Sequence, residues 1–300
     1  MQYRDLNTYL RERFGKKVYK ISLSTPFTCP NRDGTKGVGG CIFCSGQGSG
    51  SFAAEARLPV SEQLRQGKSR VRKKAGEGAG YIAYFQAFTS TYGPVSVQKK
   101  LFEEALADPE VVALSVATRP DCLPEEVLEL LGSLNEKKPV FVELGLQTAR
   151  EDTARLLNRC YDNAVFDRAV AALRARGLEV VAHLILGLPG EEHEDELASL
   201  SYVCKRGVTG VKFHLLHVLR DTVLAQMDYT PLDFEEYVFR VTDLVRHTPP
   251  SVVIHRLTGD GDKRELIAPL WSGDKKHVLN AIAASLRREN VTQGEALEDF

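Results

Sequence analysis

The chain has 300 residues, of which 43% are hydrophobic and 26% charged, and its formal net charge is -1. A chain of this length can bury one large core, and the near-zero net charge means that a nucleic-acid partner has to be argued from local patches. No apolar run approaches the ~20 residues of a membrane helix, and the charged start lacks the apolar segment of a signal peptide. We therefore expect one cytoplasmic domain over residues 1–300, away from membranes.

The first predicted elements are a helix and a strand. A helix over residues 3–14 is indicated by apolar side chains at helical spacing, namely Tyr3, Leu6, Leu10 and Phe14. The alternating segment Val18–Leu23 predicts a strand. A glycine-rich loop over residues 26–50 follows, and it contains three of the six cysteines.

From there on, helical and apolar segments alternate. The predicted helices are Ser61–Lys74, Val97–Ala107, Glu125–Leu134, Ala164–Arg176, Asp195–Lys205 and Phe234–Arg246. The predicted strands are Tyr81–Phe88, Val111–Ala117, Val140–Leu146, Val180–Leu186, Val211–Leu216 and Val252–Leu257. This alternation, with continuously apolar strands, indicates a parallel α/β fold.

Polar residues cluster just past the predicted strand ends, where a (β/α) barrel builds its site. We therefore predict a full or partial TIM-like (β/α) barrel of about seven strands, with a core to about residue 258. A C-terminal helical extension is expected over residues 263–300, with a helix at His277–Arg288.

The cysteines of the glycine-rich loop are Cys29, Cys41 and Cys44, here called the loop cysteines, with the spacing C-x11-C-x2-C. The other three cysteines are scattered, at Cys122, Cys160 and Cys204. Thiolates are soft ligands that suit iron–sulfur clusters or zinc. Three thiolates on a 4Fe–4S cluster leave one iron open to a small molecule, whereas a structural zinc needs four ligands, and no fourth Cys or His lies nearby. The pattern favours a cluster over zinc.

The cysteine loop resembles that of stand-alone bacterial radical S-adenosylmethionine (SAM) proteins of the YhcC/YtqA type. These are similar in turn to the radical SAM domain of the Elongator catalytic subunit and to oxygen-independent coproporphyrinogen oxidase. The resemblance extends over nearly the whole chain and includes Tyr84–Tyr92, Thr118–Asp121, Glu143–Thr148, Asn158–Arg159, His183–Glu191, Val211–His217 and His255–Leu257.

This resemblance implies a partial barrel, a 4Fe–4S cluster on the loop cysteines, and SAM as a cofactor. It also implies reductive cleavage of SAM to a 5′-deoxyadenosyl radical, with the electron supplied by a reductant such as flavodoxin or ferredoxin. The implied reaction site lies at the carboxyl-terminal mouth of the barrel.

Several residues are implied by the resemblance to bind SAM. Gln86 and Thr89 take the position that holds the methionine end of SAM, and a helix cap is the structural alternative. Glu143 would be costly to bury unpaired. Its implied partner is the SAM amino group or ribose, and the alternative is an ion pair with Arg119 or Arg159.

The same resemblance gives three more positions a role toward SAM. Gln147 has the same implied role as Glu143. Arg159 would fork onto the SAM carboxylate, or else lie on a helix surface. Gly187 would permit a close approach to the adenine, and a plain strand-to-helix turn is the other interpretation.

The catalytic residue itself is not predicted, but Lys212, His214 and Arg256 are candidates. Lys212 and His214 share one strand face by the period of two. If that face is the barrel interior, they line the substrate cavity together with Arg256, His183 and His217. Ordinary hydrogen-bonded structure is the alternative. Cys160 lies in a loop on the predicted active side, where it could donate a hydrogen atom or form a thioether.

The segment Lys68–Lys74, here called the basic run, has five basic residues in seven. Together with Lys16 and Lys17 it is expected to flank the barrel mouth, where it could contact phosphates. A solvated helix face is the alternative. The Elongator resemblance implies transfer RNA (tRNA) as a partner and a wobble-uridine side chain as the substrate. A small metabolite is the second hypothesis, and a non-catalytic metal-binding module is the third.

Overall fold

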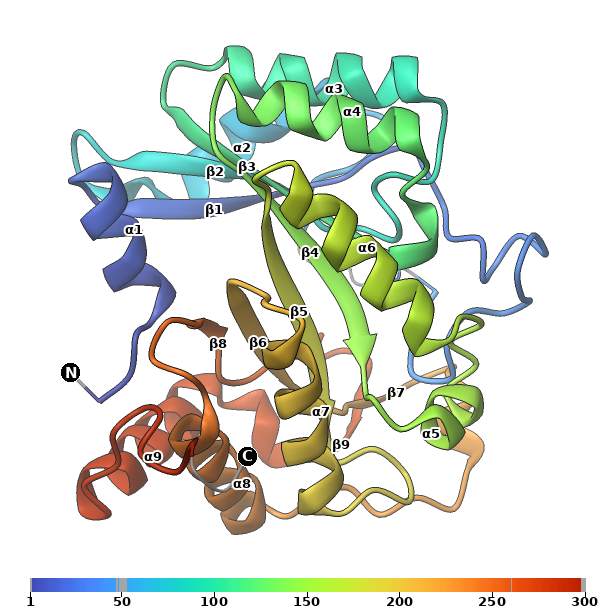
Figure 1. The fold of residues 1–300 in the computed structure, drawn as a ribbon, viewed down its shortest axis with the longest axis vertical. Helices are drawn as coiled ribbons and strands as arrows, with labels where there is room; N and C mark the ends of the chain where they lie inside the picture. Colours follow the sequence, from blue (N-terminus) through green and yellow to red (C-terminus); the bar gives the residue numbers. More distant parts are fainter. Residues whose placement is uncertain (1, 47, 49–52, 260, 298–300) are drawn as a thin grey trace.

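Seven parallel strands form one curled sheet, a half-barrel, in the order β1-β2-β3-β4-β5-β6-β8 (Figure 1). The computed structural model describes residues 2–46, 48, 53–259 and 261–297. The strands are β1 Val18–Leu23, β2 Gly80–Phe85, β3 Val111–Thr118, β4 Val140–Gln147, β5 Glu179–Leu186, β6 Gly210–Leu215 and β8 Val253–Arg256. β1 and β8 end the sheet and are not paired with each other within the described residues, which confirms a partial rather than a full barrel.

Helices cover the outer face of this sheet (Figure 1). They are α1 Leu6–Phe14, α2 Val60–Ala75, α3 Val95–Ala107, α4 Glu125–Asn135, α5 Glu151–Leu156, α6 Asn163–Ala175, α7 His193–Lys205, α8 Phe234–His247 and α9 Lys275–Arg288. The strands are apolar throughout because outward side chains such as Phe85 and Leu114 join the main core with helix residues such as Phe102. None of the helices within the described residues is long and apolar enough to span a membrane.

The predicted helices and strands are confirmed, with small shifts at their ends. The first helix begins at Leu6 because the Asp5 carboxylate accepts a hydrogen bond from the backbone N–H of Thr8 at 2.7 Å and caps it. β2 ends at Phe85 instead of residue 88, since Phe88 has a φ of 53°. Helix α5 and a small antiparallel pair, β7 Val218–Leu219 with β9 Leu266–Ala268, are not in the prediction.

Inward-facing side chains fill the half-barrel in layers. At the amino ends of the strands the layer is apolar, where Val18, Ile82, Ala113 and Phe141 pack against Leu10 of α1. Helix α1 thereby closes this end of the barrel. Two residues further along the same strands the layer becomes polar and charged, with Lys20, Tyr84, Ser115 and Glu143.

The two ends of the barrel differ in their connections. The loop after β1, which carries the cysteines, leaves the carboxyl ends of the strands at the right of Figure 1, while α1 and the starts of β1 and β2 lie at the left. Residues 47, 49 and 50 of the predicted cysteine loop and residues 298–300 of the predicted extension lie outside the described residues. The assignment of residues 1–300 to one domain stays a prediction.

Candidate functional site

A cavity of about 450 Å³ lies inside the half-barrel toward the carboxyl ends of the strands. Its lining unites most residues that the sequence singles out, namely Cys29, Cys41, Cys44, Gln86, Thr89, Glu143, Gln147, Arg159, His183, His214, His217 and Arg256. A groove of about 680 Å³ on the outside of the barrel, against α4 and α6, contains none of these residues. The chemistry-bearing side chains therefore converge on the inner cavity.

The cysteine loop is held in place by the turn after α5. The side-chain amide of Asn31 donates to the backbone carbonyl of Asn158 and lies 3.6 Å from the Cys41 sulfur. The side-chain amide of Asn158 in turn donates to the carbonyl of Gly40 at 2.8 Å. A guanidinium N–H of Arg32 donates to the carbonyl of Cys44 at 3.1 Å. These contacts fix the loop against the barrel rim before any metal binds.

The arrangement of the loop cysteines fits a cluster. Among the residues that the structure describes, no three His, Cys, Asp or Glu side chains are grouped to hold a single metal ion. A 4Fe–4S cluster requires a wider spacing, because each thiolate binds a different iron. Burial, together with Cys44, raises the pKa of Cys41 to about 12, so this thiol would release a proton when it binds a metal.

Gln86, Thr89 and Gln147 lie at the rim of the cavity, just beyond the strands. Gln86 is half-buried, and its side-chain oxygen accepts a hydrogen bond from the Ser22 hydroxyl at 3.3 Å. Thr89 is buried, and its backbone N–H donates to the carbonyl of Thr28 at 3.3 Å. Gln147 has a φ of 68°, and its side-chain oxygen lies 3.4 Å from the hydroxyl of Tyr161. Their place at the rim is where the resemblance puts the SAM-binding residues.

Glu143 is fully buried at the centre of a charged layer. Its carboxylate accepts hydrogen bonds from the ammonium of Lys20 at 2.5 Å and the hydroxyl of Ser115 at 2.7 Å, and it also pairs with the ammonium of Lys212 and with His183 Nε2 at 2.8 Å. Burial would raise the pKa of this carboxyl, but Lys20 and Lys212 outweigh it and hold the pKa well below its usual range. The predicted alternative of an ion pair with an arginine is therefore wrong.

Lys212 and His214 both face the barrel interior, as the period of two predicts. Lys212 is buried, and its ammonium contacts the Tyr84 hydroxyl at 3.2 Å in addition to Glu143. The imidazole of His214 lines the cavity and lies 5.0 Å from that of His183, centroid to centroid. Burial, with Lys212 next, lowers the pKa of His183 to about 4, so this ring is neutral at pH 7.

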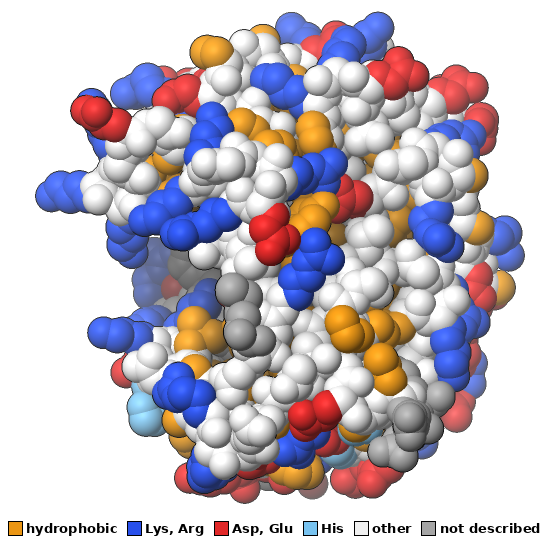
Figure 2. Space-filling view, turned by 60° about the vertical axis from the view of Figure 1, so that its left-hand side comes forward, with side chains coloured by type: hydrophobic (Ala, Val, Ile, Leu, Met, Phe, Trp, Pro, Cys, Tyr) orange, Lys and Arg blue, Asp and Glu red, His pale blue; other side chains and the backbone are white. Residues whose placement is uncertain are grey.

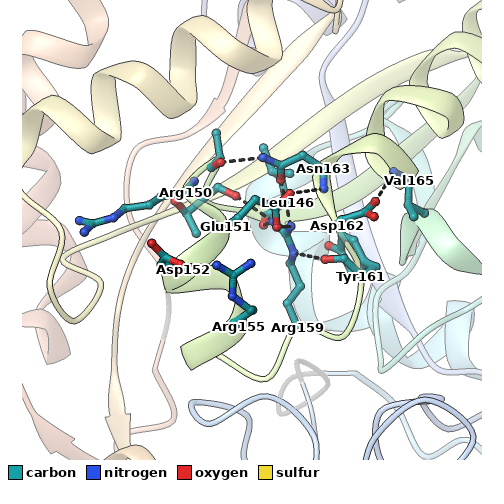
Figure 3. Close-up of polar contacts among 12 residues, drawn as sticks. Leu146, Arg150, Glu151, Asp152, Arg155, Arg159, Tyr161, Asp162, Asn163 and Val165 are labelled. Atoms are coloured by element: carbon teal, nitrogen blue, oxygen red, sulfur yellow. Dashed lines mark hydrogen bonds and ion pairs between the residues drawn. The ribbon is translucent and has the colours of Figure 1, made fainter.

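Arg159 is buried, with an exposed fraction of 1%, and all its N–H groups are used within the protein (Figure 3). One terminal nitrogen donates to the carbonyls of Leu146 at 3.0 Å and Thr148 at 2.9 Å, and Nε donates to the carbonyl of Tyr161 at 2.9 Å. The other terminal nitrogen contacts Asn163 at 2.9 Å and Glu151 at 3.3 Å.

This network corrects the surface interpretation of Arg159. It also leaves no N–H of Arg159 for the SAM carboxylate unless one of these bonds breaks. We assign Arg159 to the positioning of the turn that holds the cysteine loop.

Gly187 does not line the cavity. It has a φ of 75°, and a Cβ on it would lie 2.8 Å from Cγ of Leu232 and 3.5 Å from the hydroxyl oxygen of Tyr229. Its close neighbours are thus side chains of this chain, and the predicted approach to the adenine is not what the geometry shows. Cys160 is exposed and is also absent from the cavity lining.

The basic run lies at the opposite end of the barrel from the cysteines. Helix α2 runs back from the carboxyl end of β1, so Lys73 and Lys74 precede the start of β2, and the backbone N–H of Gly80 donates to the carbonyl of Lys17. The prediction that these residues flank the mouth is therefore wrong. Lys68 is also paired, with Asp108 and Glu110. Figure 2, which turns this side forward, shows Lys and Arg side chains around a hollow at the left.

Protein-family models match nearly the whole chain. The model of the radical SAM superfamily matches residues 28–203, and that of the radical SAM C-terminal domain matches residues 208–288. The chain belongs to the radical SAM superfamily. It is therefore a radical SAM enzyme, and the hypothesis of a non-catalytic metal-binding module is set aside.

Relatives from bacteria match the radical SAM chain over most of its length. YtqA of Bacillus subtilis is 44% identical over 298 residues, which cover 98% of this chain and 92% of YtqA. YhcC of Escherichia coli K12 is 39% identical over 295 residues, which cover 96% and 93%. A tRNA uridine(34) acetyltransferase of Dehalococcoides mccartyi is 29% identical over 156 residues, which cover 50% of this chain and 33% of that protein. The resemblance to the YhcC/YtqA type is confirmed.

The fold is similar to a solved structure of Elp3 from the archaeon Methanocaldococcus infernus. The TM-score is 0.72 at 16% sequence identity, and the match covers 92% of this chain and 64% of that one. At this identity the likeness concerns the fold alone, and it confirms the partial barrel of the radical SAM type.

Lys20 and Ser115 are site residues that sequence reasoning missed. The alternating pattern of Val18–Leu23 places Lys20 on the same face as Ser22, which lines the cavity. A lysine on the inner face of a barrel strand is a detectable signal. Ser115 carries no such signal, because a serine within an apolar strand is common.

Proposed function

We propose that the loop cysteines hold a 4Fe–4S cluster and that SAM binds beside it in the cavity and is cleaved reductively. The observation that carries this proposal is how the six cysteines are divided. The three loop cysteines line the cavity with the polar residues at the strand ends, whereas Cys122 lines the outer groove, and neither Cys160 nor Cys204 lines either space.

When bound, the cluster and SAM supply one electron and a 5′-deoxyadenosyl radical, which is chemistry that side chains cannot provide. The chain's own residues bind, orient and exclude water. Gln86 and Gln147 offer amide groups that both donate and accept hydrogen bonds, as the polar groups of SAM require. Phe43 and Phe88 add apolar lining next to the loop cysteines and reduce the access of water.

Iron content tests the cluster. Anaerobically reconstituted protein should hold about four irons per chain, and alanine at any loop cysteine should abolish this content. Cys204→Ala is the matched control, because this thiol lies on α7, away from the cavity, and it should keep the iron. Stoichiometric zinc without iron after anaerobic reconstitution would contradict the proposal.

Cofactor turnover tests the rest of the proposal. With dithionite, the reconstituted enzyme should form 5′-deoxyadenosine and methionine even without substrate. Gln86→Ala should weaken SAM binding by about 0.5–1.5 kcal/mol, the usual worth of a hydrogen bond. Whether Glu143 also contacts SAM stays a prediction, and an unchanged SAM affinity in Glu143→Gln would remove it from the SAM site.

For the substrate, we propose a wobble uridine of tRNA. This rests on the partial match to the tRNA uridine(34) acetyltransferase, which covers half of this chain. Comparison of the modified nucleosides in tRNA from cells with and without the enzyme tests it. The alanine variant of Arg70, Arg72, Lys73 and Lys74 should weaken tRNA binding and reduce the salt slope by about 0.7 for each lost contact to a single strand.

A small metabolite is the second candidate substrate. It is favoured by the place of the basic run at the amino end of the barrel, away from the loop cysteines. If the quadruple variant binds tRNA as well as the parent at every salt concentration, and tRNA nucleosides do not change, the small-metabolite candidate takes precedence.

A further inference from the structure

The charged layer inside the barrel contains more cations than carboxylates. Lys20 and Lys212 both pair with Glu143. Arg256 lines the same cavity and stands opposite Lys212 in the strand register. Asp262, the other carboxylate in the lining, is held by Arg264 at 2.7 Å. Among the described residues, three cations thus share one carboxylate in this layer.

We propose that the substrate carries an anionic group, a carboxylate or a phosphate, that binds in this layer against Arg256, His214 and Lys212. The inference rests on the proposed function, because it assigns the inner half of the cavity to the substrate of the SAM-dependent reaction. Buried charges are retained when they are paired, and the missing negative charge is what an anionic ligand would bring.

His214 supports this assignment independently of the charge count. Its Nε2 is buried and has no hydrogen-bond partner, although the ring lines the cavity. Buried polar atoms in folded proteins are nearly always hydrogen-bonded, so this nitrogen is a position that a ligand oxygen can satisfy. It belongs to the strand that also carries Lys212.

SAM itself is a poor match for this layer. At neutral pH, SAM carries a sulfonium, an ammonium and a carboxylate, so its net charge is positive. The layer lies two residues deeper along β1 and β2 than Ser22 and Gln86, which stand at the rim near the loop cysteines. The excess of cations is therefore placed beyond the predicted SAM position, on the side left for a second molecule.

The protonation of Lys212 gives a second observable. Burial, with Lys20 and Arg256 nearby, holds the pKa of Lys212 well below its usual value although Glu143 opposes this shift. The groups that face this ammonium are Lys20, Tyr84, Glu143, His183 and Arg256. An anion that enters the layer would raise this pKa, so its binding should be accompanied by proton uptake near neutral pH.

Direct binding to the reconstituted holoenzyme tests the proposal. The probes are inorganic phosphate, acetate and uridine 5′-monophosphate, with uncharged uridine as the reference, and dissociation constants come from ligand-observed NMR. At least one anion should bind, and Arg256→Gln should raise its dissociation constant tenfold or more. Arg246→Gln, which removes an arginine of α8 paired with Glu289 and Glu295, should stay within twofold of the parent.

The arms of the experiment separate the sources of the anion. Tighter binding of uridine 5′-monophosphate than of phosphate and uridine indicates a nucleotide phosphate, and tighter binding of acetate than of phosphate indicates a small carboxylate. If Arg256→Gln does not fold, the double variant Lys212→Met/Glu143→Gln replaces it and should weaken the same anion.

Equal affinity for uridine and its monophosphate, with no probe affected by either variant, overturns the proposal. Formation of 5′-deoxyadenosine is measured on the same samples. An enzyme that cleaves SAM but binds no anion therefore refutes this inference and not the proposed function.

Discussion

Two buried charged groups in this radical SAM enzyme lie close to the same cavity, and they are satisfied in opposite ways. Arg159 directs its five N–H groups to three backbone carbonyls and two side chains, so the protein uses all its donors. In the layer around Glu143, two lysines and Arg256 share one carboxylate. Both groups line the cavity, but in the second the protein does not balance its own charge.

The difference separates a structural role from a binding role. A buried cation whose donors are all used gains nothing from a ligand and loses bonds if it turns toward one. A layer with surplus cations has the opposite property, because an anion adds partners without removing any. Site residues in this fold are thus better recognised by what their neighbours leave unsatisfied than by burial or by place in the sequence.

The largest expected effect comes from Arg159→Ala. Loss of the guanidinium leaves the carbonyls of Leu146, Thr148 and Tyr161 without these donors, and unsatisfied buried acceptors cost about 1–3 kcal/mol each. The free energy of unfolding should fall by about 3–5 kcal/mol, measured by urea denaturation at pH 7. Arg155→Ala, at an exposed pair with Asp152, is the control and should change it by less than about 1 kcal/mol.

The comparison would break if Arg159→Ala kept its stability and lost SAM affinity. Arg159 would then hold the SAM carboxylate, as the sequence resemblance implies, and its bonds in Figure 3 would not be the reason for its burial.

A smaller loss is expected for Glu143→Gln. The amide keeps the size of the side chain but leaves Lys20 and Lys212 without a counter-charge, which should cost about 2–3 kcal/mol. The pKa of Glu143 lies lower in the folded chain than the ~4.3 of an unfolded one. Its contribution is therefore complete above about pH 5 and is lost as the pH falls below the unfolded value.

Denaturation of parent and Glu143→Gln at pH 7 and pH 4 checks this. The difference in stability between the two proteins should shrink at the lower pH, and a constant difference would show that packing rather than charge is lost.

The sequence predicts the barrel and the loop cysteines well, because continuous apolar strands and a clustered cysteine triad are local signals. It does not predict the partners of Glu143, since Lys20, His183 and Lys212 come from three other strands and meet only through the curvature of the sheet. The place of the basic run, in contrast, could have been predicted. A helix that connects two parallel strands has to end where the second strand begins.

A third buried ionic group, between α7 and α8, should show a pH dependence of the opposite sign. His193 bonds Asp243 at 2.8 Å and Glu196 at 3.3 Å. Burial would lower the pKa of His193, but these carboxylates raise it to about 9. Its stabilisation, about 1–2 kcal/mol after solvent screening, is complete below the unfolded value of about 6.5 and is lost as the pH rises through about 9. Thermal unfolding of parent and His193→Asn should converge at high pH, and divergence there would contradict the ion pair.

The smallest effect on stability is expected for Lys212→Met, which removes one of the surplus cations. Glu143 keeps its bonds to Lys20, Ser115 and His183, and an apolar side chain of similar volume avoids the cost of burying a second ammonium. The free energy of unfolding should change by less than about 1 kcal/mol in either direction, measured by urea denaturation at pH 7. A loss of about 3 kcal/mol or more would show that Glu143 needs both lysines and that the layer has no charge to offer a ligand. An unchanged stability, combined with weaker anion binding, would separate the two buried groups as the comparison with Arg159 requires.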